Sequence, residues 1–134
     1  VVRLNPDAVG PVVLDSFVVA GLGDDVIEVI EPTPDGNMLI AGGVSASIDF
    51  GLEEPLTHHG GVDLFAVELD AALTPLRQLS VGGQDDQRAT HARFTPGGDL
   101  ILGGVLRAGT VAPPLLSNGA QDVMLLCYRC ESGL

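Results

Sequence analysis

Apolar residues along this chain come in short runs that are separated by proline, glycine and aspartate. Val26 to Ile30 is rich in β-branched residues, and Met38 to Ala41 is almost wholly apolar, which indicates burial on both faces of a sheet. Side chains in the segment Asp63 to Asp70 are expected to lie alternately on the two faces of a strand. Leu76 to Val81 follows a turn at Thr74-Pro75. The pattern predicts four short strands and leaves little room for a long helix.

Two features between these runs indicate how the strands are joined. Pro34-Asp35-Gly36-Asn37 has the residues of a tight turn, because proline presets φ, aspartate can close an Asx-turn, and glycine and asparagine tolerate positive φ. Gly42-Gly43, at the end of the second predicted strand, indicates a bulge or a close approach of two backbones.

The strongest signal is an internal repeat with an offset of 61 or 62 residues. Its clearest segments are Gly23-Asp24-Asp25 with Gln84-Asp85-Asp86, Thr33 to Asn37 with Thr95 to Asp99, Leu39 to Val44 with Leu100 to Val105, and Leu56 to Phe65 with Leu116 to Met124. Val1 to Asn5 also matches Ala66 to Asp70. Residues 1–22 are therefore assigned to the C-terminal part of one unit, 23–83 to a complete unit, and 84–134 to a second, incomplete unit.

Four strands in roughly 60 residues, with recurrent glycine, are typical of a β-propeller blade. We therefore predict an all-β fold of four-stranded antiparallel blades, of which a little over two are present. Two blades by themselves leave apolar faces and strand edges exposed. The expected partners are further blades of the same longer chain or other copies of the chain, and ends that are out of phase with the unit favour the longer chain.

The unit resembles a known family. Asp49-Phe50-Gly51 and Gly60 to Asp70 are similar to the seven-bladed β-propeller repeat family called SBBP, which is common in secreted and envelope proteins of bacteria. This resemblance implies an extracellular or cell-envelope location. Two departures concern blade detail: Leu76 to Leu79 lacks the family's usual aromatic residue, and Ala108 to Thr110 has no Asp-Phe-Gly counterpart.

The net charge of the chain makes some classes of binding partner unfavourable. Eighteen Asp and Glu face six basic residues, for a formal net charge of −12, which disfavours nucleic acid and anionic membrane surfaces. Hydrophobic residues make up 46% of the chain, enough for a buried core, but no apolar run is long enough to cross a membrane as a helix. Cations, basic partners and neutral ligands stay compatible with this charge.

Repeated acidic pairs are the first candidate site. Asp24-Asp25 and Asp85-Asp86 have the oxygen ligands that Ca²⁺ prefers, but they are also suited to capping the turn before each first strand by accepting backbone N–H bonds. Because a structural need recurs in every unit, the repetition favours capping.

Histidines provide two further candidates. His58-His59 lies in a glycine-flanked segment and is interpreted as an exposed loop, with a metal or acid–base role as the alternative. His91 and Arg93 lie two apart on a predicted strand and hence on one face. In a propeller that strand lines the central channel, so they face a ligand there or pair with Glu28 or Glu31 of the next unit, and we favour the pairing.

Cys127 and Cys130 form a C-x-x-C whose first residue lies on a predicted strand. Strand geometry places their side chains on opposite faces, which favours two ordinary thiols over a strained disulfide or a metal site. The chain contains no G-x-S-x-G, phosphate-loop or zinc signature, and Ser45 and Ser47 have no histidine close in sequence.

These observations assign no catalytic, cofactor-binding or metal-binding residue, but they do support an expectation about function. The first hypothesis is a non-catalytic extracellular or envelope scaffold that binds protein or glycan. The alternatives are a propeller hydrolase or lyase with its site in the central channel, and a structural subunit that assembles into rings or fibres.

Overall fold

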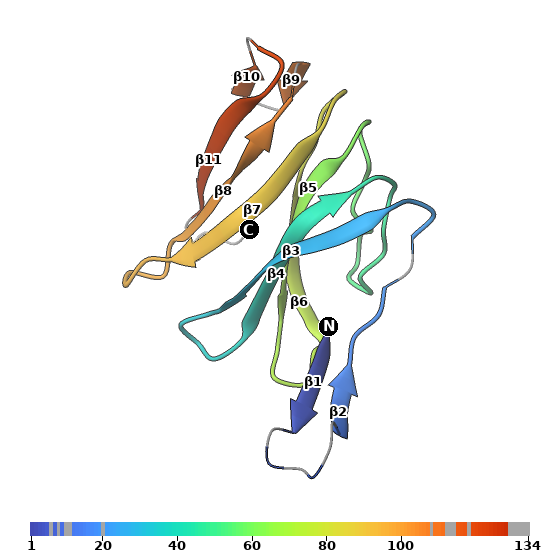
Figure 1. Cartoon of the computed structure of the whole chain (residues 1–134), viewed down its shortest axis with the longest axis vertical. Coiled ribbons are helices and arrows are strands. Elements are labelled where there is room, and N and C mark those ends of the chain that lie inside the picture. The colour runs from blue at the N-terminus through green and yellow to red at the C-terminus, as the bar shows by residue number, and fades with distance from the viewer. Residues whose placement is uncertain are drawn as a thin grey trace.

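The computed structural model describes residues 1–5, 7, 9, 12–19, 21–107, 109–111, 115–117 and 119–128, and these residues form strands, turns and loops without a helix (Figure 1). The strands are β1 (Val2–Asn5), β2 (Val12–Ser16), β3 (Asp25–Pro32), β4 (Met38–Val44), β5 (Asp63–Leu69), β6 (Pro75–Val81), β7 (Gln87–Phe94), β8 (Leu100–Leu106), β9 (Gly109–Val111), β10 (Leu115–Ser117) and β11 (Asp122–Tyr128). The predicted all-β class is confirmed. No helix in the described part of the chain is long and apolar enough to span a membrane.

The first sheet is a four-stranded antiparallel meander in the order β3-β4-β5-β6. Its strands are the four that the sequence predicts for the complete unit, extended by one to three residues at some ends. The turn between β3 and β4 has Gly36 at a φ of 83°, which explains the glycine at that position. It is closed by the Thr33 hydroxyl, which accepts a hydrogen bond from the Asn37 backbone N–H at 3.0 Å.

The second sheet has three antiparallel strands in the order β11-β8-β7. Its turn between β7 and β8 copies the first one, because Thr95 Oγ1 accepts from the Asp99 N–H at 3.1 Å and Gly98 has a φ of 85°. Between β8 and β11 the hairpin β9–β10 is formed. The first unit has only the isolated bridge Ile48–Leu56 at this place.

The strand pairing determines how the two units align. Met38 pairs with Pro32 and Leu100 with Phe94, directly after equivalent turns, so the offset is 62 residues throughout β3–β4 and β7–β8. Both pairings are interrupted by a bulge at the same place, between Ile27 and Val29 and between Ala89 and His91. The offset of 61 that the sequence suggests for Leu39 to Val44 is therefore wrong by one residue.

The bulge explains why the glycine pair led to the wrong alignment. A Cβ atom at Gly42 would overlap the carbonyl oxygen of Val26, and one at Gly104 would overlap that of Arg88. These two glycines are equivalent at an offset of 62, whereas Gly43 and Gly103 have other surroundings. The predicted close approach of two backbones is thus confirmed at Gly42.

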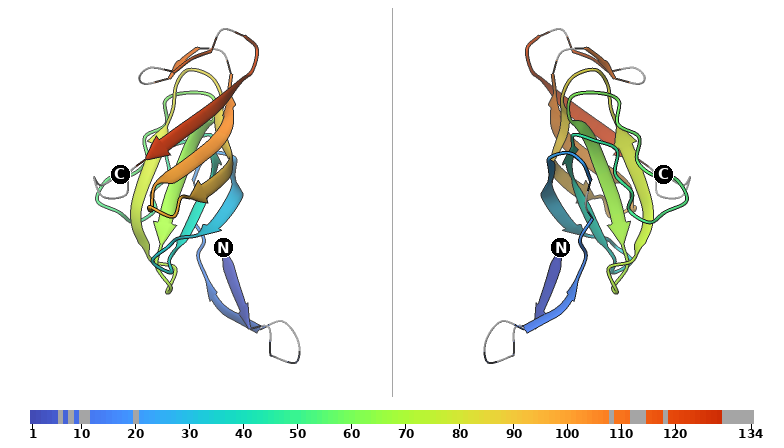
Figure 2. Two further views of the ribbon diagram at one scale, coloured as in Figure 1. Left: turned by 90° about the vertical axis from the view of Figure 1, so that its left-hand side faces the viewer. Right: turned by 90° about the vertical axis from the view of Figure 1, so that its right-hand side faces the viewer.

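The two sheets stack face to face and enclose the main core (Figure 2). The buried side chains from the first sheet are Val29, Leu39, Ala41, Leu64 and Ala66, and those from the second are Ala89, Leu100, Leu102, Leu106 and Met124. At the structural offset, Leu39 is equivalent to Ile101 and not to the buried Leu100 with which it was matched in sequence. The first sheet therefore contacts the second through one face of the repeat unit, and the second sheet contacts the first through the opposite face of the unit. Successive members of a stack meet in the same way.

A second core lies on the other face of the first sheet. Its buried residues are Ile40, Val44, Ile48, Phe50, Leu56, Phe65, Val67, Leu69 and Leu73. Val1, Phe17 and Val19, which flank the hairpin β1–β2, pack against it, while the hairpin itself projects away from the two sheets (Figure 2). β1 and β2 pair antiparallel as β5 and β6 do, and β1 is the strand that was matched with the end of β5 in sequence. Blades of a closed propeller stay a prediction.

Candidate functional site

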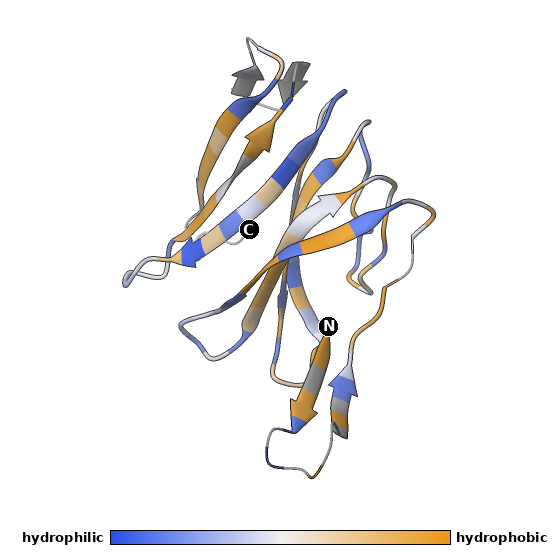
Figure 3. Cartoon of the chain, in the orientation of Figure 1, coloured by the Kyte–Doolittle hydropathy of each residue, from blue (hydrophilic) through white to orange (hydrophobic). Residues whose placement is uncertain are grey.

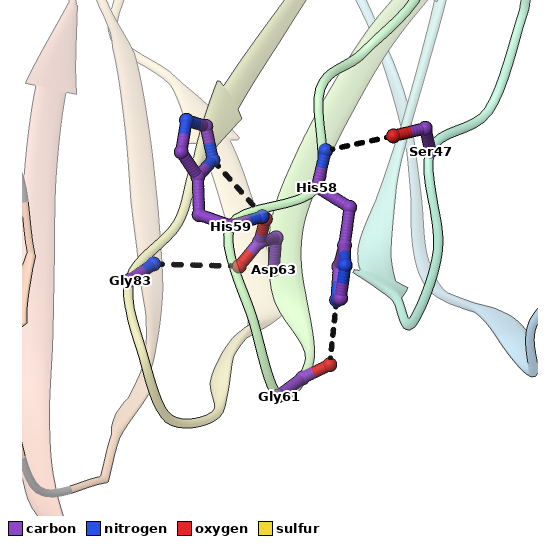
Figure 4. A network of polar contacts seen from close by, with 6 residues as sticks. All are labelled: Ser47, His58, His59, Gly61, Asp63 and Gly83. Carbon is purple, nitrogen blue, oxygen red and sulfur yellow. Dashed lines mark hydrogen bonds and ion pairs between the residues drawn. The ribbon is translucent and has the colours of Figure 1, made fainter.

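The histidine loop connects β4 to β5 and is organised by a buried carboxylate at the start of β5 (Figure 4). Asp63 is fully buried, and its Oδ2 accepts the backbone N–H of His59 at 2.6 Å. Its Oδ1 accepts the Gly83 N–H at 3.4 Å from the connection between β6 and β7. Asp63 therefore ties two loops together at one end of the sheet.

The two histidine rings point in different directions in this loop (Figure 4). His59 Nδ1 lies 3.3 Å from Asp63 Oδ2, and its side chain is 53% exposed. His58 Nε2 donates to the Gly61 carbonyl at 2.9 Å, because a carbonyl oxygen can only accept. The predicted exposed loop is confirmed for His59. The pairing with Asp63 was missed, although an aspartate at i+4 beyond two turn-forming glycines was a visible signal.

The serines of the same loop hold its backbone. Ser47 Oγ accepts the His58 N–H at 3.1 Å, and Ser45 Oγ accepts the Asp24 N–H at 2.6 Å. Among the described residues no serine hydroxyl is hydrogen-bonded to an imidazole. The loop thus pairs an imidazole with a carboxylate while its hydroxyls support the main chain.

The acidic pairs have different surroundings in the two units. Asp86 Oδ1 accepts the Val62 N–H at 3.1 Å, so it does bind a backbone group, but one from another loop instead of the turn before its own strand. Its Oδ2 lies 3.5 Å from Arg107 Nη1. No group of three or more His, Cys, Asp or Glu residues that could hold a metal occurs within the described ranges.

The first strands of the two sheets, β3 and β7, lie near each other (Figure 1). Their side chains form ion pairs with one another. Arg93 Nη1 lies 3.0 Å from Glu31 Oε1, which confirms the predicted ion pair. Glu28 pairs with Arg88, also at 3.0 Å, and not with His91. His91 and Arg93 are both exposed, as expected for residues two apart on a strand, and the His91 ring contacts Thr90 Oγ1 at 3.0 Å.

A cavity of about 110 Å³ opens beside the first sheet, and sequence reasoning did not find it. Its walls are mainly apolar, and three of them are aromatic rings in a row: Phe17 to Phe50 at 6.3 Å and Phe50 to Phe65 at 5.5 Å between centroids. Asp25 is the acidic residue in its lining, and the Oδ1 atom of this residue is buried without a hydrogen-bond partner. The phenylalanine of Asp49-Phe50-Gly51 was the available signal.

The first cysteine of the C-x-x-C lies among the described residues. Cys127 is a free, exposed thiol on β11, and Cys130 lies outside the described residues.

Comparison with known proteins found no matching family model, no matching curated protein and no matching solved structure. The function must therefore be inferred from the geometry of the stack and its charged edge.

Proposed function

We propose that the chain is a β-propeller segment of the SBBP type that serves as a non-catalytic extracellular or cell-envelope scaffold for binding protein or glycan. One observation carries most of this proposal: the two repeat units stack through opposite faces with a constant offset of 62 residues over the first two strands of each unit. A stack of this kind can be continued by further units, and the blades of a propeller are arranged in this way around an axis.

The charged edge is the part of this scaffold best suited to a ligand. In a propeller the first strands face the central channel, and here β3 and β7 present Glu28, Glu31, Arg88, His91 and Arg93 side by side. Paired acidic and basic groups donate and accept hydrogen bonds at once, which suits sugar hydroxyls and peptide groups. The net charge of −12 favours neutral or basic ligands over anionic ones.

The proposal is tested by calorimetric titration of the chain with neutral oligosaccharides, amino-sugar oligosaccharides and basic peptides. We expect one class to bind, and the double variant H91A/R93A to weaken that binding at least about tenfold, because both side chains are exposed on the edge. Arg107→Ala is the matched control, since its side chain is also exposed but pairs with Asp86 and takes no part in the ion pairs between β3 and β7. Chemical conversion of a bound probe, or binding that the double variant leaves unchanged, contradicts the proposal.

A further inference from the structure

The cavity beside the first sheet has one charged residue in its wall. Asp25 begins β3 and lines this cavity, and every other residue in the lining is apolar. In Figure 3 the hydrophilic start of β3 borders a hydrophobic stretch of the same strand. The Oδ1 atom of Asp25 is buried without a hydrogen-bond partner, and the ion pairs of the described residues involve other carboxylates. The described part of the chain therefore leaves this negative charge uncompensated, which is unfavourable beside apolar groups.

The repeat unit does not need this charge in order to fold. At the offset of 62, the residue equivalent to Asp25 is Gln87, a neutral amide that is 1% exposed. Phe65 of β5 corresponds in the same way to Met124 of β11. The second unit thus has neither the carboxylate nor the ring at these places, whereas the turn and bulge glycines recur in both units. The combination of a carboxylate with aromatic rings points to a role other than folding.

The cavity is open to solvent and small. Val26 and Ile27 of its lining are 42% and 41% exposed, whereas Phe50 and Phe65 are 6% and 2% exposed. Its volume of about 110 Å³ compares with about 150 Å³ for an engineered protein cavity that binds benzene. Because benzene has six heavy atoms, a group of about four heavy atoms fits here.

The lining favours one class of ligand. Asp25 and the net charge of −12 repel anions. Ca²⁺ needs about six to eight oxygen ligands, and within the described ranges no group of three or more His, Cys, Asp or Glu residues could hold a metal. A neutral apolar ligand would leave the carboxylate without a partner. An organic cation with apolar substituents pairs its charge with the carboxylate and places its substituents against the rings, which also attract cations.

The number of hydrogen-bond donors distinguishes between organic cations. A primary ammonium has three N–H donors, and the side chains of this lining offer them a single carboxylate, that of Asp25. A quaternary ammonium has no N–H donor, so it loses no hydrogen bond on entering an apolar cavity. A trimethylammonium head also has the four heavy atoms that the volume allows.

We propose that this cavity binds a quaternary ammonium group, with its charge beside Asp25 and its methyl groups against Phe17, Phe50 and Phe65. Free small molecules and methylated lysine side chains both carry this group. None of the residues of the charged edge lines the cavity, so the inference does not rest on the proposed function.

A matched pair of ligands tests the need for charge. Choline has a trimethylammonium head, and the alcohol in which carbon replaces its nitrogen has the same shape without the charge. Titration of the isotope-labelled chain, followed by NMR, measures both dissociation constants. We expect choline to shift the amide signals of Val26 and Ile27 and to bind at least about tenfold more tightly than the alcohol. Absence of choline binding, or equal binding of the two compounds, overturns the proposal.

Charge-matched variants locate the site. D25N removes the carboxylate at nearly constant volume and should weaken choline binding at least about tenfold. D24N is the control, because it removes the same charge from an exposed neighbour that does not line the cavity. Since the second unit folds with an amide at the equivalent position, D25N should keep the circular dichroism of the parent. Choline binding that D25N leaves unchanged, or that D24N weakens equally, overturns the proposal.

Removal of one ring tests the apolar wall. F17A should weaken choline binding several-fold, whereas V18A, at a neighbouring residue that is 82% exposed, should leave it unchanged. F17A that keeps the circular dichroism of the parent and binds choline equally well overturns the proposal.

Two further measurements separate the possible sources of the group and the two candidate sites. A short peptide with one trimethyllysine that binds more tightly than choline assigns the ligand to a protein side chain, and weaker binding assigns it to a free small molecule. Either assignment requires that D25N weaken the binding. Choline binding that is lost in H91A/R93A and kept in D25N would place the ligand at the charged edge and overturn the inference. Failure of choline to bind leaves the proposed function standing, because that function is tested with other ligands.

Discussion

The two sheets of this chain have similar strand patterns and very different surroundings. Every residue of β5 is buried and β4 is buried from Leu39 onward, because the first sheet has the second sheet on one face and the Phe17–Phe50–Phe65 cluster on the other. In β8 burial alternates residue by residue, and β11 exposes Val123 and Leu125. The same apolar pattern can therefore lead to two burial patterns, depending on what lies against the strand.

This difference separates the sequence features that a single sheet requires from those that the packing of one sheet on another requires. Features that recur in both units, such as the Thr–Gly turn and the bulge glycine, act within one sheet. Features that differ, such as Leu64 against Val123, depend on the neighbouring sheet. Equivalent substitutions in the two sheets can therefore test which features belong to the unit and which to the stack.

Glycine at the bulge should give the largest effect, and equally in both sheets. Gly104→Ala places a Cβ against the Arg88 carbonyl oxygen and should lower the free energy of unfolding by about 3 kcal/mol or more. Gly103→Ala meets only the His91 Cβ at 3.7 Å and should change it by less than about 1 kcal/mol. Urea unfolding measures both. Tolerance of alanine at position 104 would show that the bulge adapts and that the unit is less constrained than its pairing indicates.

Truncation at equivalent core positions should separate the two sheets. Leu64→Ala removes a fully buried side chain and should cost about 3 kcal/mol, whereas Val123→Ala at an exposed position should cost less than about 0.5 kcal/mol. Chemical denaturation at low micromolar concentration measures the difference. A similar cost at both positions would indicate that the outer face of the second sheet is covered in solution even at that dilution.

The stability lost on removing an ion pair should likewise differ between a buried pair and an exposed one. Glu68 is buried, and Arg77 Nε donates to its Oε2 at 2.6 Å, so Arg77→Gln leaves a poorly compensated carboxylate and should cost about 2 kcal/mol. The Arg93 side chain is 80% exposed, and Arg93→Gln should cost less than about 0.5 kcal/mol and respond to salt. Unfolding at low and high salt checks both, and a cost for Arg93→Gln equal to that for Arg77→Gln would refute the distinction.

The smallest effect concerns Tyr128, the single tyrosine of the chain, which packs against the shared core from β11. Burial raises its pKa above the ordinary 10.0, because desolvation disfavours the phenolate. The contribution of the neutral phenol to stability is therefore complete below pH 10.0 and declines as the pH rises toward the folded pKa. Phenolate absorbance should titrate at a higher pH in the folded chain than in urea, and identical midpoints would place the ring outside the core.

The local structure could be predicted well and the candidate sites only in part. Runs of β-branched residues and the turn at Pro34 to Asn37 led to the four strands of the first sheet, and spacing on β7 led to the Arg93–Glu31 pair. The pairing of Glu28 with Arg88, the Asp63 network and the cavity at Asp25 were not found. Each depends on residues that are distant in sequence, and periodicity reports only the direction of a side chain, not what it meets.

The sequence by itself determined the unit: an apolar strand pattern with a period of two, turns that need positive φ, and a repeat close to 60 residues, all of which follow from local sterics and alternation. The tertiary structure decided the true offset of 62, because the bulge requires glycine opposite one particular carbonyl. It also decided that the first sheet is buried on both faces and the second sheet mainly on one. That difference depends on which sheet lies against each face, and no single strand contains this information.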